Sequence, residues 1–422
     1  MHHSPAPDDT PVTTDPTSRL ATVLASLTPW PDDGSRADGP VAVDATDRLL
    51  LDEAAPLLAE AGPGDVVVLG DRFGALTLGA ATLGAPDVRS CTDTVTAEAA
   101  LERNLAGAGV LDLVRGDRPS VEIDLRDRVD EHLLGGARVV LLQLPPSLAE
   151  LTEIAEAIAR HAAEDVTVLA GGRVKHMSRS MNDVLAASFA DVRASLARQK
   201  SRVLVASGVR PEARDAEPSF PVRAVLRDAE LLTAASAEGS APDGITVASH
   251  GGTFAGPSLD LGTRFLLTTA AKWPAADRVH DALDLGSGTG LLATVLALRY
   301  PEARVLATDR SAAAVASTRA TAAANGVGER VAVLRDDAGE DLEPASLDLI
   351  LLNPPFHDRA AVRTDAAHRM FRAAGRALRQ GGELWCVFNT ALHYRQALTR
   401  DVGPTVHIEQ NPKFTVTRSR RR

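Results

Sequence analysis

Asn353-Pro354-Pro355-Phe356 places an amide, two prolines and an aromatic ring directly after an apolar run. An amino group on a base is a poor nucleophile, because its lone pair is delocalised into the ring. The Asn353 side-chain oxygen and the Pro354 backbone carbonyl could hold its hydrogens and aim the lone pair at a methyl donor. Pro355 stiffens the loop, and the Phe356 ring could stack a flipped base. The tetrad therefore predicts N-methylation that needs no metal.

The alternative for the same tetrad is a proline turn that closes a buried strand with an aromatic plug. His357 follows closely enough to touch a substrate, although a hydrogen-bonded loop histidine is the simpler interpretation. Pro355 and His357 are expected at the substrate side of the loop, and Asn353 is expected to contact the cofactor as well.

Further upstream, an apolar strand runs through a glycine-rich turn into a helix-forming stretch, in the sequence DALDLGSGTG of residues 281–290. Glycines let the chain reverse and let a ligand approach the backbone amides of a helix N-terminus. The Gly-x-Gly-x-Gly spacing differs from the Gly-x-Gly-x-x-Gly of dinucleotide binders and favours S-adenosylmethionine over NAD. The cofactor-binding residues expected here are Asp284, Gly286, Ser287, Gly288, Thr289 and Gly290.

Acidic residues stand at the ends of the next two apolar segments. Asp309 lies 19 residues beyond Gly290, where a carboxylate can accept hydrogen bonds from both ribose hydroxyls of a nucleoside. Asp336 and Asp337 end the following segment, where an acidic side chain could take the exocyclic amino group of adenine. Each of these aspartates could also be an ordinary surface residue at a strand end.

Short apolar strands alternate with helix-forming stretches in both halves of the chain, which predicts an α/β fold built on parallel, doubly wound sheets. Strands are expected at 65–70, 137–144, 165–170, 278–286, 303–309, 330–337, 347–353 and 381–389, and helices at 96–106 and 147–162.

The two halves align at a nearly constant offset, which indicates a duplicated domain. The aligned markers are Gly70 with Gly286, Asp93 with Asp309, Gly109 with Gly326, and Leu144-Pro145-Pro146-Ser147 with Asn353-Pro354-Pro355-Phe356. In the first half the glycine turn reads Gly70-Asp71-Arg72-Phe73-Gly74, and Leu144 and Ser147 take the positions of the amide and the ring. The first half is therefore expected to have lost cofactor and base binding.

Composition and charge restrict the class of protein. The 422 residues are 45% hydrophobic and carry a net charge of -11, which does not suit a general nucleic-acid binder but allows a local basic patch. Arg173, Lys175 and Arg179 form such a patch and are candidates for phosphate contacts; the alternative is a solvated loop.

Two distant cysteines predict neither a zinc site nor a disulfide framework. Without a signal peptide or an apolar membrane span, a cytoplasmic protein, expected to be monomeric, is the simplest interpretation.

The glycine turn, the acidic strand end and Asn-Pro-Pro-Phe, in this order, resemble the class I S-adenosylmethionine-dependent methyltransferases that modify exocyclic or amide nitrogens. Residues 40–400 resemble a narrower group, the bacterial ribosomal RNA guanine-N2 methyltransferases, through the segments 69–76, 171–181 and 253–267. The last segment contains Phe254, Leu259-Asp260-Leu261-Gly262 and Arg264, and Arg264 is a candidate for substrate binding. The resemblance implies two tandem Rossmann-like methyltransferase domains, of which the N-terminal one is degenerate.

The resulting domain boundaries run along the whole chain. We expect a flexible leader at 1–38, a degenerate RNA-recognition domain at 39–206, a connection at 207–245, a catalytic domain at 246–410 and a basic tail at 411–422.

The function expected from these features is methyl transfer from S-adenosylmethionine to the exocyclic N2 of a guanine in ribosomal RNA, either free or in a ribosomal subunit. Adenine N6 or a protein glutamine amide would suit the same acceptor pair. A non-catalytic RNA-binding or ribosome-assembly protein is the alternative from another class.

Overall fold

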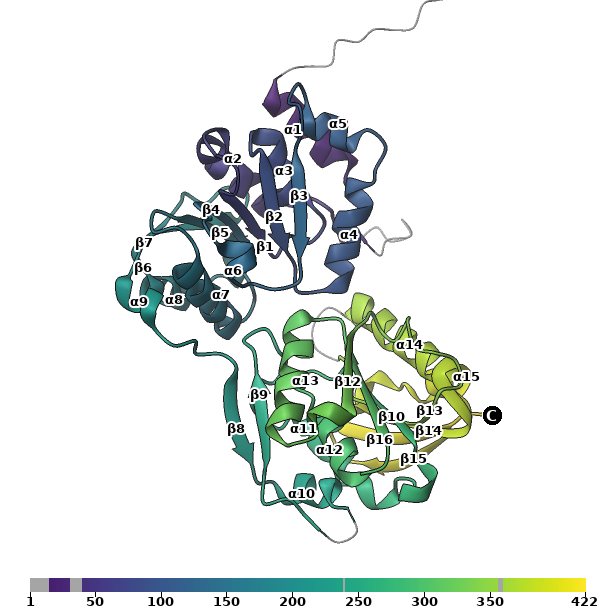
Figure 1. Ribbon diagram of the computed structural model, residues 1–422. Helices are drawn as coiled ribbons and strands as arrows, with labels where there is room; N and C mark the ends of the chain where they lie inside the picture. Colours follow the sequence, from purple (N-terminus) through teal and green to yellow (C-terminus); the bar gives the residue numbers. More distant parts are fainter. Residues whose placement is uncertain (1–14, 31–39, 238–239, 356–359) are drawn as a thin grey trace, which may run out of the picture. The chain divides into compact units, whose positions relative to one another are not determined.

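The computed structural model describes residues 15–30, 40–237, 240–355 and 360–422, with the backbone alone for 360–365. The chain forms two compact units, and each contains its own seven-stranded sheet (Figure 1).

The sheet of the first half has the strand order β3-β2-β1-β4-β5-β7-β6. Its first five strands are parallel, and β7 pairs antiparallel with both β5 and β6. The strands are β1 (Val66–Leu69), β2 (Asp87–Cys91), β3 (Glu122–Arg126), β4 (Val139–Gln143), β5 (Thr167–Arg173), β6 (Phe189–Ala194) and β7 (Ser201–Val209). The helices are α1 (Pro16–Ser26), α2 (Ala45–Ala59), α3 (Ala75–Leu83), α4 (Val95–Leu105), α5 (Val110–Arg115), α6 (Glu131–Leu134), α7 (Leu148–His161), η1 (Val174–His176), α8 (Arg179–Ser188) and α9 (Pro211–Asp215).

The sheet of the second half repeats that order as β12-β11-β10-β13-β14-β16-β15, which confirms the expected duplication. The strands are β10 (Asp281–Leu285), β11 (Arg304–Asp309), β12 (Val331–Arg335), β13 (Leu347–Leu352), β14 (Leu378–Asn389), β15 (Thr405–Gln410) and β16 (Phe414–Arg420). The helices are α11 (Leu261–Leu267), η2 (Ala270–Lys272), η3 (Ala276–Arg278), α12 (Leu291–Arg299), α13 (Ala312–Ala324), η4 (Gly328–Arg330), α14 (Ala360–Ala377), η5 (Thr390–Leu392) and α15 (Arg395–Asp401). Neither sheet is wholly parallel, because the last two strands of each form an antiparallel pair.

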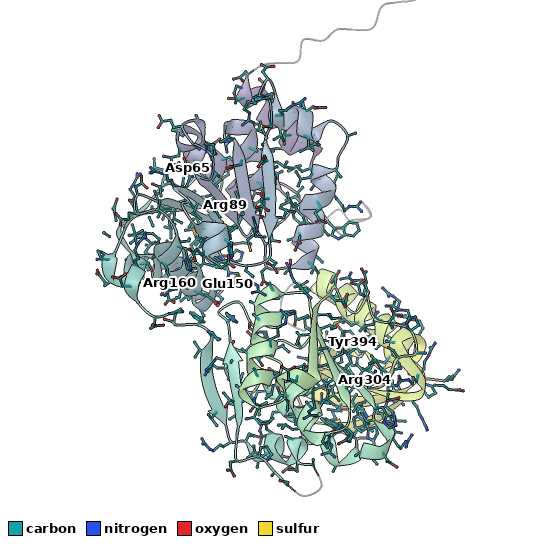
Figure 2. All side chains as sticks on the ribbon, in the orientation of Figure 1. Asp65, Arg89, Glu150, Arg160, Arg304 and Tyr394 are labelled. Carbon is teal, nitrogen blue, oxygen red and sulfur yellow. The ribbon has the colours of Figure 1, made fainter. Side chains whose placement is uncertain are left out.

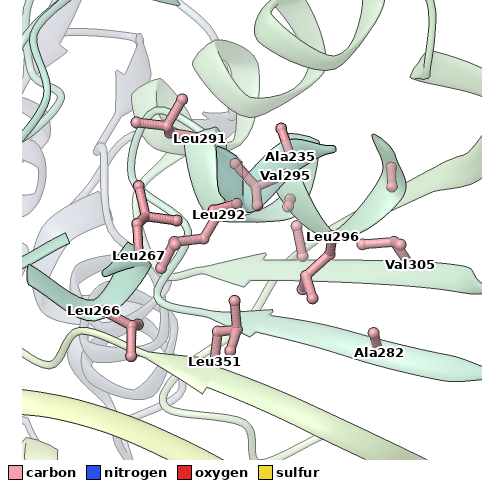
Figure 3. Close-up of a cluster of buried hydrophobic side chains, with 14 of the residues drawn as sticks. Ala235, Leu266, Leu267, Ala282, Leu291, Leu292, Val295, Leu296, Val305 and Leu351 are labelled. Carbon is pink, nitrogen blue, oxygen red and sulfur yellow. The ribbon is translucent and has the colours of Figure 1, made fainter. Parts of the chain in front are cut away.

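The core of the sheet in the second half explains why its central strands were recognisable in the sequence. Every residue of β10 is buried, and α12 is buried from Leu291 to Ala297, so neither shows an amphipathic alternation. Figure 3 shows α12 residues such as Leu292 and Leu296 packed against β-strand residues such as Ala282 and Leu351. This packing fixes the strand ends from which the candidate site is built.

Part of the expected leader is a helix. Asp15 caps α1 by accepting a hydrogen bond from the Ser18 amide at 3.0 Å, and a proline starts the first turn. Val23, Leu24 and Leu27 are buried in the core of the first half. The expectation of a flexible leader was therefore wrong for Pro16–Ser26, because the polar composition of the surrounding residues hid a short apolar stripe.

The basic tail expected at 411–422 is instead largely the strand β16, which lies between β14 and β15. Phe414 and Val416 are buried, and Thr417 and Ser419 are fully covered as well. β16 is hydrogen-bonded along both of its edges, to β14 and to β15, so the arginines at its end do not mark a free tail.

The expected connection at 207–245 contains more structure than a linker. It includes the hairpin strand β8 (Val222–Leu226), helix α10 (Ala229–Ala235) and the first residue of β9 (Ile245–Ser249). Leu231 and Ala234 are buried in the same core as α12, and residues from 216 onward belong to the second unit. The second compact unit therefore starts earlier than residue 246, where the catalytic domain was expected to begin.

The burial of α1 gives a stability prediction. We expect Leu24→Ala to lower the free energy of unfolding of the first half by about 2–5 kcal/mol, because it leaves a cavity among α1, α3 and α5. The exposed Thr22→Ala on the same helix is the control and should change little. Urea unfolding would measure both variants; equal midpoints would contradict the packing of α1.

Candidate active site

The glycine turn between β10 and α12 leaves its backbone open. Gly286, Gly288 and Gly290 have φ angles of +80°, +53° and +76°, which favour glycine. A Cβ atom at Gly290 would lie 2.6 Å from the Thr318 Cα atom, whereas one at Gly288 would meet no atom within 4 Å. The helix can therefore approach its neighbour closely at Gly290, while a ligand has room at Gly288.

Two carboxylates, the buried Asp284 and the half-buried Asp309, support this turn. Asp284 accepts a hydrogen bond from the Ala293 amide at 2.9 Å, in the first turn of α12, and burial raises the pKa of Asp284 to about 7. Asp309 accepts one from the Gly288 amide at 2.9 Å and one from the Ser311 amide at 3.0 Å. Burial raises the pKa of Asp309 as well. Asp309 lines a cavity beside the turn, and Asp284 lies beneath the turn.

Ser287 and Thr289, also expected at the cofactor, are both buried in this turn. The Ser287 hydroxyl lies 2.9 Å from that of Thr318, so it joins the turn to α13. Its role at a ligand remains a prediction.

The aspartates after β12 differ in what they can offer a ligand. Asp337 forms an ion pair with Arg369, with N–O distances of 2.6 and 2.8 Å. Asp336 is buried, and its Oδ2 atom accepts no hydrogen bond from the described residues. Burial raises the pKa of Asp336. Both residues line the cavity, but Asp336 is the one with an oxygen available for an amino group.

Asn353 is held in one orientation. Its Nδ2 atom donates to the Asp260 carboxylate at 3.0 Å and to the Thr263 hydroxyl at 2.9 Å. Asp260 also caps α11, because the Gly262 and Thr263 amides donate to the same oxygen at 2.9 and 3.0 Å. An ionised carboxylate only accepts hydrogen bonds, so the amide must turn its nitrogen toward Asp260.

This orientation leaves the Asn353 Oδ1 atom as an acceptor. The atom is buried and has no hydrogen-bond partner in the described part of the chain, although a buried unsatisfied oxygen is costly. Asn353, Pro354 and Pro355 line the same cavity as Gly288 and Asp309. An acceptor is thus positioned beside the open glycine turn, which suits an amino group presented to a bound cofactor.

The remaining predicted residues lie in three places. Phe356 and His357 fall outside the described residues. Arg264 donates from Nε to Asp228 at 2.8 Å, and its side chain is 45% exposed. Arg173 is the last residue of β5 in the first half, and Lys175 and Arg179 follow it on η1 and α8. Their substrate contacts remain predictions.

Other residues near these positions were missed by the sequence interpretation. Asp260 was noticed only as part of a resemblance, and Thr263 and Met370 were not considered; Met370 lines the cavity next to Gly286. Near the basic patch, β7 runs antiparallel to β5 and brings Lys200 and Arg202 beside Arg173. A sequence pattern for helix capping could have identified Asp260, but only the sheet pairing identifies Lys200.

The first half keeps the shape of this site but fills it with its own side chains. The Asp71 carboxylate accepts hydrogen bonds from the Gly74 amide at 2.9 Å and from both the amide and the hydroxyl of Thr77 at 2.8 Å. The amides at the start of α3 therefore already donate to a carboxylate of the chain itself. This observation agrees with the expected degeneracy of the N-terminal domain.

The counterpart of Asn353 in the first half is Gln143 and not Leu144. Leu69 pairs with Leu142 in one sheet and Leu285 with Leu352 in the other, so the residues that follow them, Gln143 and Asn353, are equivalent. The Gln143 amide donates to Asp47 in the first turn of α2. The expected alignment was one residue out of register, and the amide is lengthened instead of lost.

The described residues fit S-adenosylmethionine: Gly288 offers open backbone, Asp309 a half-buried carboxylate and Asp336 an unpaired oxygen around one cavity. This strand order, with an open glycine turn and an oriented amide at neighbouring strand ends, defines the Rossmann-like methyltransferases that use this cofactor.

Comparisons with known proteins identify the family. The methyltransferase small domain model matches residues 244–418, and the RLMG N-terminal domain model matches residues 24–210. Ribosomal RNA large subunit methyltransferase G of Streptomyces avermitilis is 37% identical over 380 residues, which cover 89% of this chain and 92% of that protein. The protein of the same name from Ectopseudomonas mendocina is 36% identical over 383 residues, with 90% and 93% covered. This chain belongs to the family of ribosomal RNA large subunit methyltransferase G.

A solved structure supports the fold. The T. thermophilus 16S rRNA N2 G1207 methyltransferase (RsmC), in complex with AdoMet and guanosine, aligns with a TM-score of 0.68 and 21% identity. The alignment covers 94% of this chain and 95% of that one. Among the described residues, no helix has the length and apolarity to span a bilayer, and no cluster of His, Cys, Asp or Glu could hold a metal ion.

The contact between Asp260 and Asn353 can be tested separately from helix capping. We expect Asp260→Ser to lower kcat of methyl transfer roughly tenfold to a hundredfold, because serine still caps α11 but is too short to hold the Asn353 amide. Asp260→Asn is the matched control, since its side-chain oxygen can accept the same three hydrogen bonds. Kinetics and cofactor titration would be measured for both; equal kcat values would show that Asp260 serves only the helix.

Proposed function

We propose that this protein transfers a methyl group from S-adenosylmethionine to the exocyclic N2 amino group of a guanine in large-subunit ribosomal RNA. The observation that carries the proposal is the buried Asn353 Oδ1 atom, an oriented acceptor beside the open glycine turn. The names of the family's members support ribosomal RNA as the substrate. RsmC, an N2 G1207 methyltransferase solved with guanosine, supports guanine N2 as the acceptor.

The cofactor supplies an electrophilic methyl group, and the residues of this chain orient the acceptor. Asn353 Oδ1 accepts one hydrogen of the amino group, and the Pro354 carbonyl accepts the other. Both contacts strengthen as positive charge develops on nitrogen, which lowers the barrier. Asn353 does not act as a base, because an amide oxygen accepts a hydrogen bond but has little affinity for the proton.

Cofactor and RNA would be held by residues already described. Asp309 binds the ribose hydroxyls and Asp336 the adenine amino group, while the open Cα side of Gly288 faces the methionine portion. In the first half, Arg173, Lys175 and Arg179, joined by Lys200, contact RNA phosphates and so position the substrate without reading its sequence. We also place the enzyme in the cytoplasm as a monomer, because ribosomal RNA is its substrate and one chain supplies every described site group.

The substrate can be checked by nucleoside mass spectrometry of ribosomal RNA from cells with and without the gene. We expect loss of one N2-methylguanosine from large-subunit RNA. Loss of N6-methyladenosine would indicate adenine as the acceptor, and loss of a methylglutamine from a protein would indicate an amide. If no methylated residue changes, a non-catalytic role in assembly becomes the better explanation.

The role of Asn353 can be checked in vitro with purified enzyme. We expect Asn353→Ala to reduce methyl transfer by about 10²-fold or more, because the amino group loses an oriented acceptor. The affinity for S-adenosylmethionine, measured by calorimetry, should change little. Gln143→Ala, at the equivalent strand end of the first half, is the matched control. Unchanged turnover of Asn353→Ala would remove this residue from the mechanism.

A further inference from the structure

The catalytic unit contains a cleft lined by arginines at the amino ends of its strands, far from the glycine turn. Its lining includes one acidic residue, Asp401, and five arginines: Arg372, Arg376, Arg400, Arg421 and Arg422. We call this set the arginine cleft. Figure 1 shows α14 and α15 next to each other, with the end of the chain beside them. Such a concentration of positive charge contrasts with the net charge of -11 of the whole chain.

The backbone around the arginine cleft is fixed by close contacts. A Cβ atom at Gly375 would lie 2.0 Å from the Asp401 carbonyl oxygen, so α14 and α15 touch through their backbones there. The Gly381 amide donates to the Arg421 carbonyl and the Arg421 amide to that of Gly382, both at 2.9 Å. The arginines therefore project from a rigid frame and not from a loose chain end.

Two of the five arginines are explained by the fold. Arg376 donates to the carbonyl oxygens of Gly339 and Glu340 at 2.8 Å, and Arg400 forms an ion pair with Asp401 at 2.7 Å. Both lie in the last turn of a helix, where a cation is favourable.

The other three arginines, Arg372, Arg421 and Arg422, are exposed and have no acidic partner among the described residues. Other arginines at the same edge of the sheet are neutralised. Arg304, labelled in Figure 2, pairs with Asp281 at 2.6 Å, and Arg379 pairs with Asp281 and Asp348 at 2.7 and 2.8 Å. Clustered cations repel one another, so three exposed arginines without neighbouring carboxylates favour an anionic partner.

We propose that the arginine cleft binds phosphates of the ribosomal RNA backbone, on a segment distant from the methylated guanine. The guanidinium group suits phosphate oxygens because it donates two parallel hydrogen bonds. β13 separates the two edges of the sheet by six residues, or about 20 Å, so a nucleotide in the active site cannot also reach the cleft. This inference rests on the proposed function, since it takes the same RNA as the partner.

The test compares two naked substrates: full-length large-subunit ribosomal RNA, and a short fragment around the methylated guanine. Arg372→Glu/Arg421→Glu reverses two cleft charges. Arg223→Glu/Arg278→Glu is the matched control, because it changes the net charge equally at exposed positions elsewhere in the unit. Arg372→Gln/Arg421→Gln provides a milder variant, and thermal melting verifies that all variants fold.

We expect the cleft variants to raise KM for the full-length RNA roughly tenfold. In a plot of log affinity for this RNA against log salt concentration, the magnitude of the slope should fall by about 2. KM and kcat for the fragment should not change, and the control should resemble wild type. Equal behaviour of cleft and control variants would overturn the proposal, and so would an equal loss on both substrates.

Direct binding of the full-length RNA, measured by fluorescence anisotropy, separates this proposal from the proposed function. If the wild-type enzyme methylates neither substrate, the proposed function fails. The affinities of the cleft and control variants for full-length RNA still show whether the arginine cleft binds RNA. If only assembled subunits reveal a defect, the partner is an acidic protein surface, and the phosphate proposal is wrong. Competition by inorganic phosphate at millimolar concentration without any RNA-length effect would indicate a small-anion site and would also overturn it.

Discussion

The hydrogen bond from the Asn353 amide to Asp260 is the interaction on which the candidate site depends. One carboxylate oxygen both starts α11 and forces the amide nitrogen away from the cavity. The strand end that carries the acceptor and the helix that orients it come from segments 90 residues apart in sequence. The site geometry is therefore a property of the folded sheet, and local sequence around the tetrad does not determine it.

The first half shows the same arrangement with different chemistry. Gln143 is held by Asp47, a carboxylate in the capping box of α2, much as Asn353 is held by Asp260 at the cap of α11. One extra methylene moves the amide, and Asp71 occupies the helix amides that a ligand would need. The first half has thus kept hydrogen bonds that stabilise the fold. The polar groups at its glycine turn and its strand end are paired with side chains of the same half.

The central strands of both sheets were predictable from the sequence because they are buried on both faces and read as continuous apolar runs. Several other elements were not predicted, some at a sheet edge and some inside a sheet. β3 has no fully buried residue, β16 ends in arginines, and α1 lies in a polar, proline-containing region. For the site, the glycine turn and the tetrad were predictable as local motifs. The one-residue error at Gln143 arose because matching prolines were aligned, whereas hydrogen-bonded register decides which residues are equivalent.

The occupied turn of the first half also has a thermodynamic consequence. Asp71 satisfies the start of α3 from within the chain, so the amides of that turn need no ligand to pair them. The turn at Gly288 leaves open space, and a ligand that binds only the folded form adds free energy of unfolding as its concentration rises. The two turns of common origin are therefore coupled differently to their surroundings: the turn of the first half is stabilised from within the chain, whereas the turn of the second half also gains stability from the supply of methyl donor.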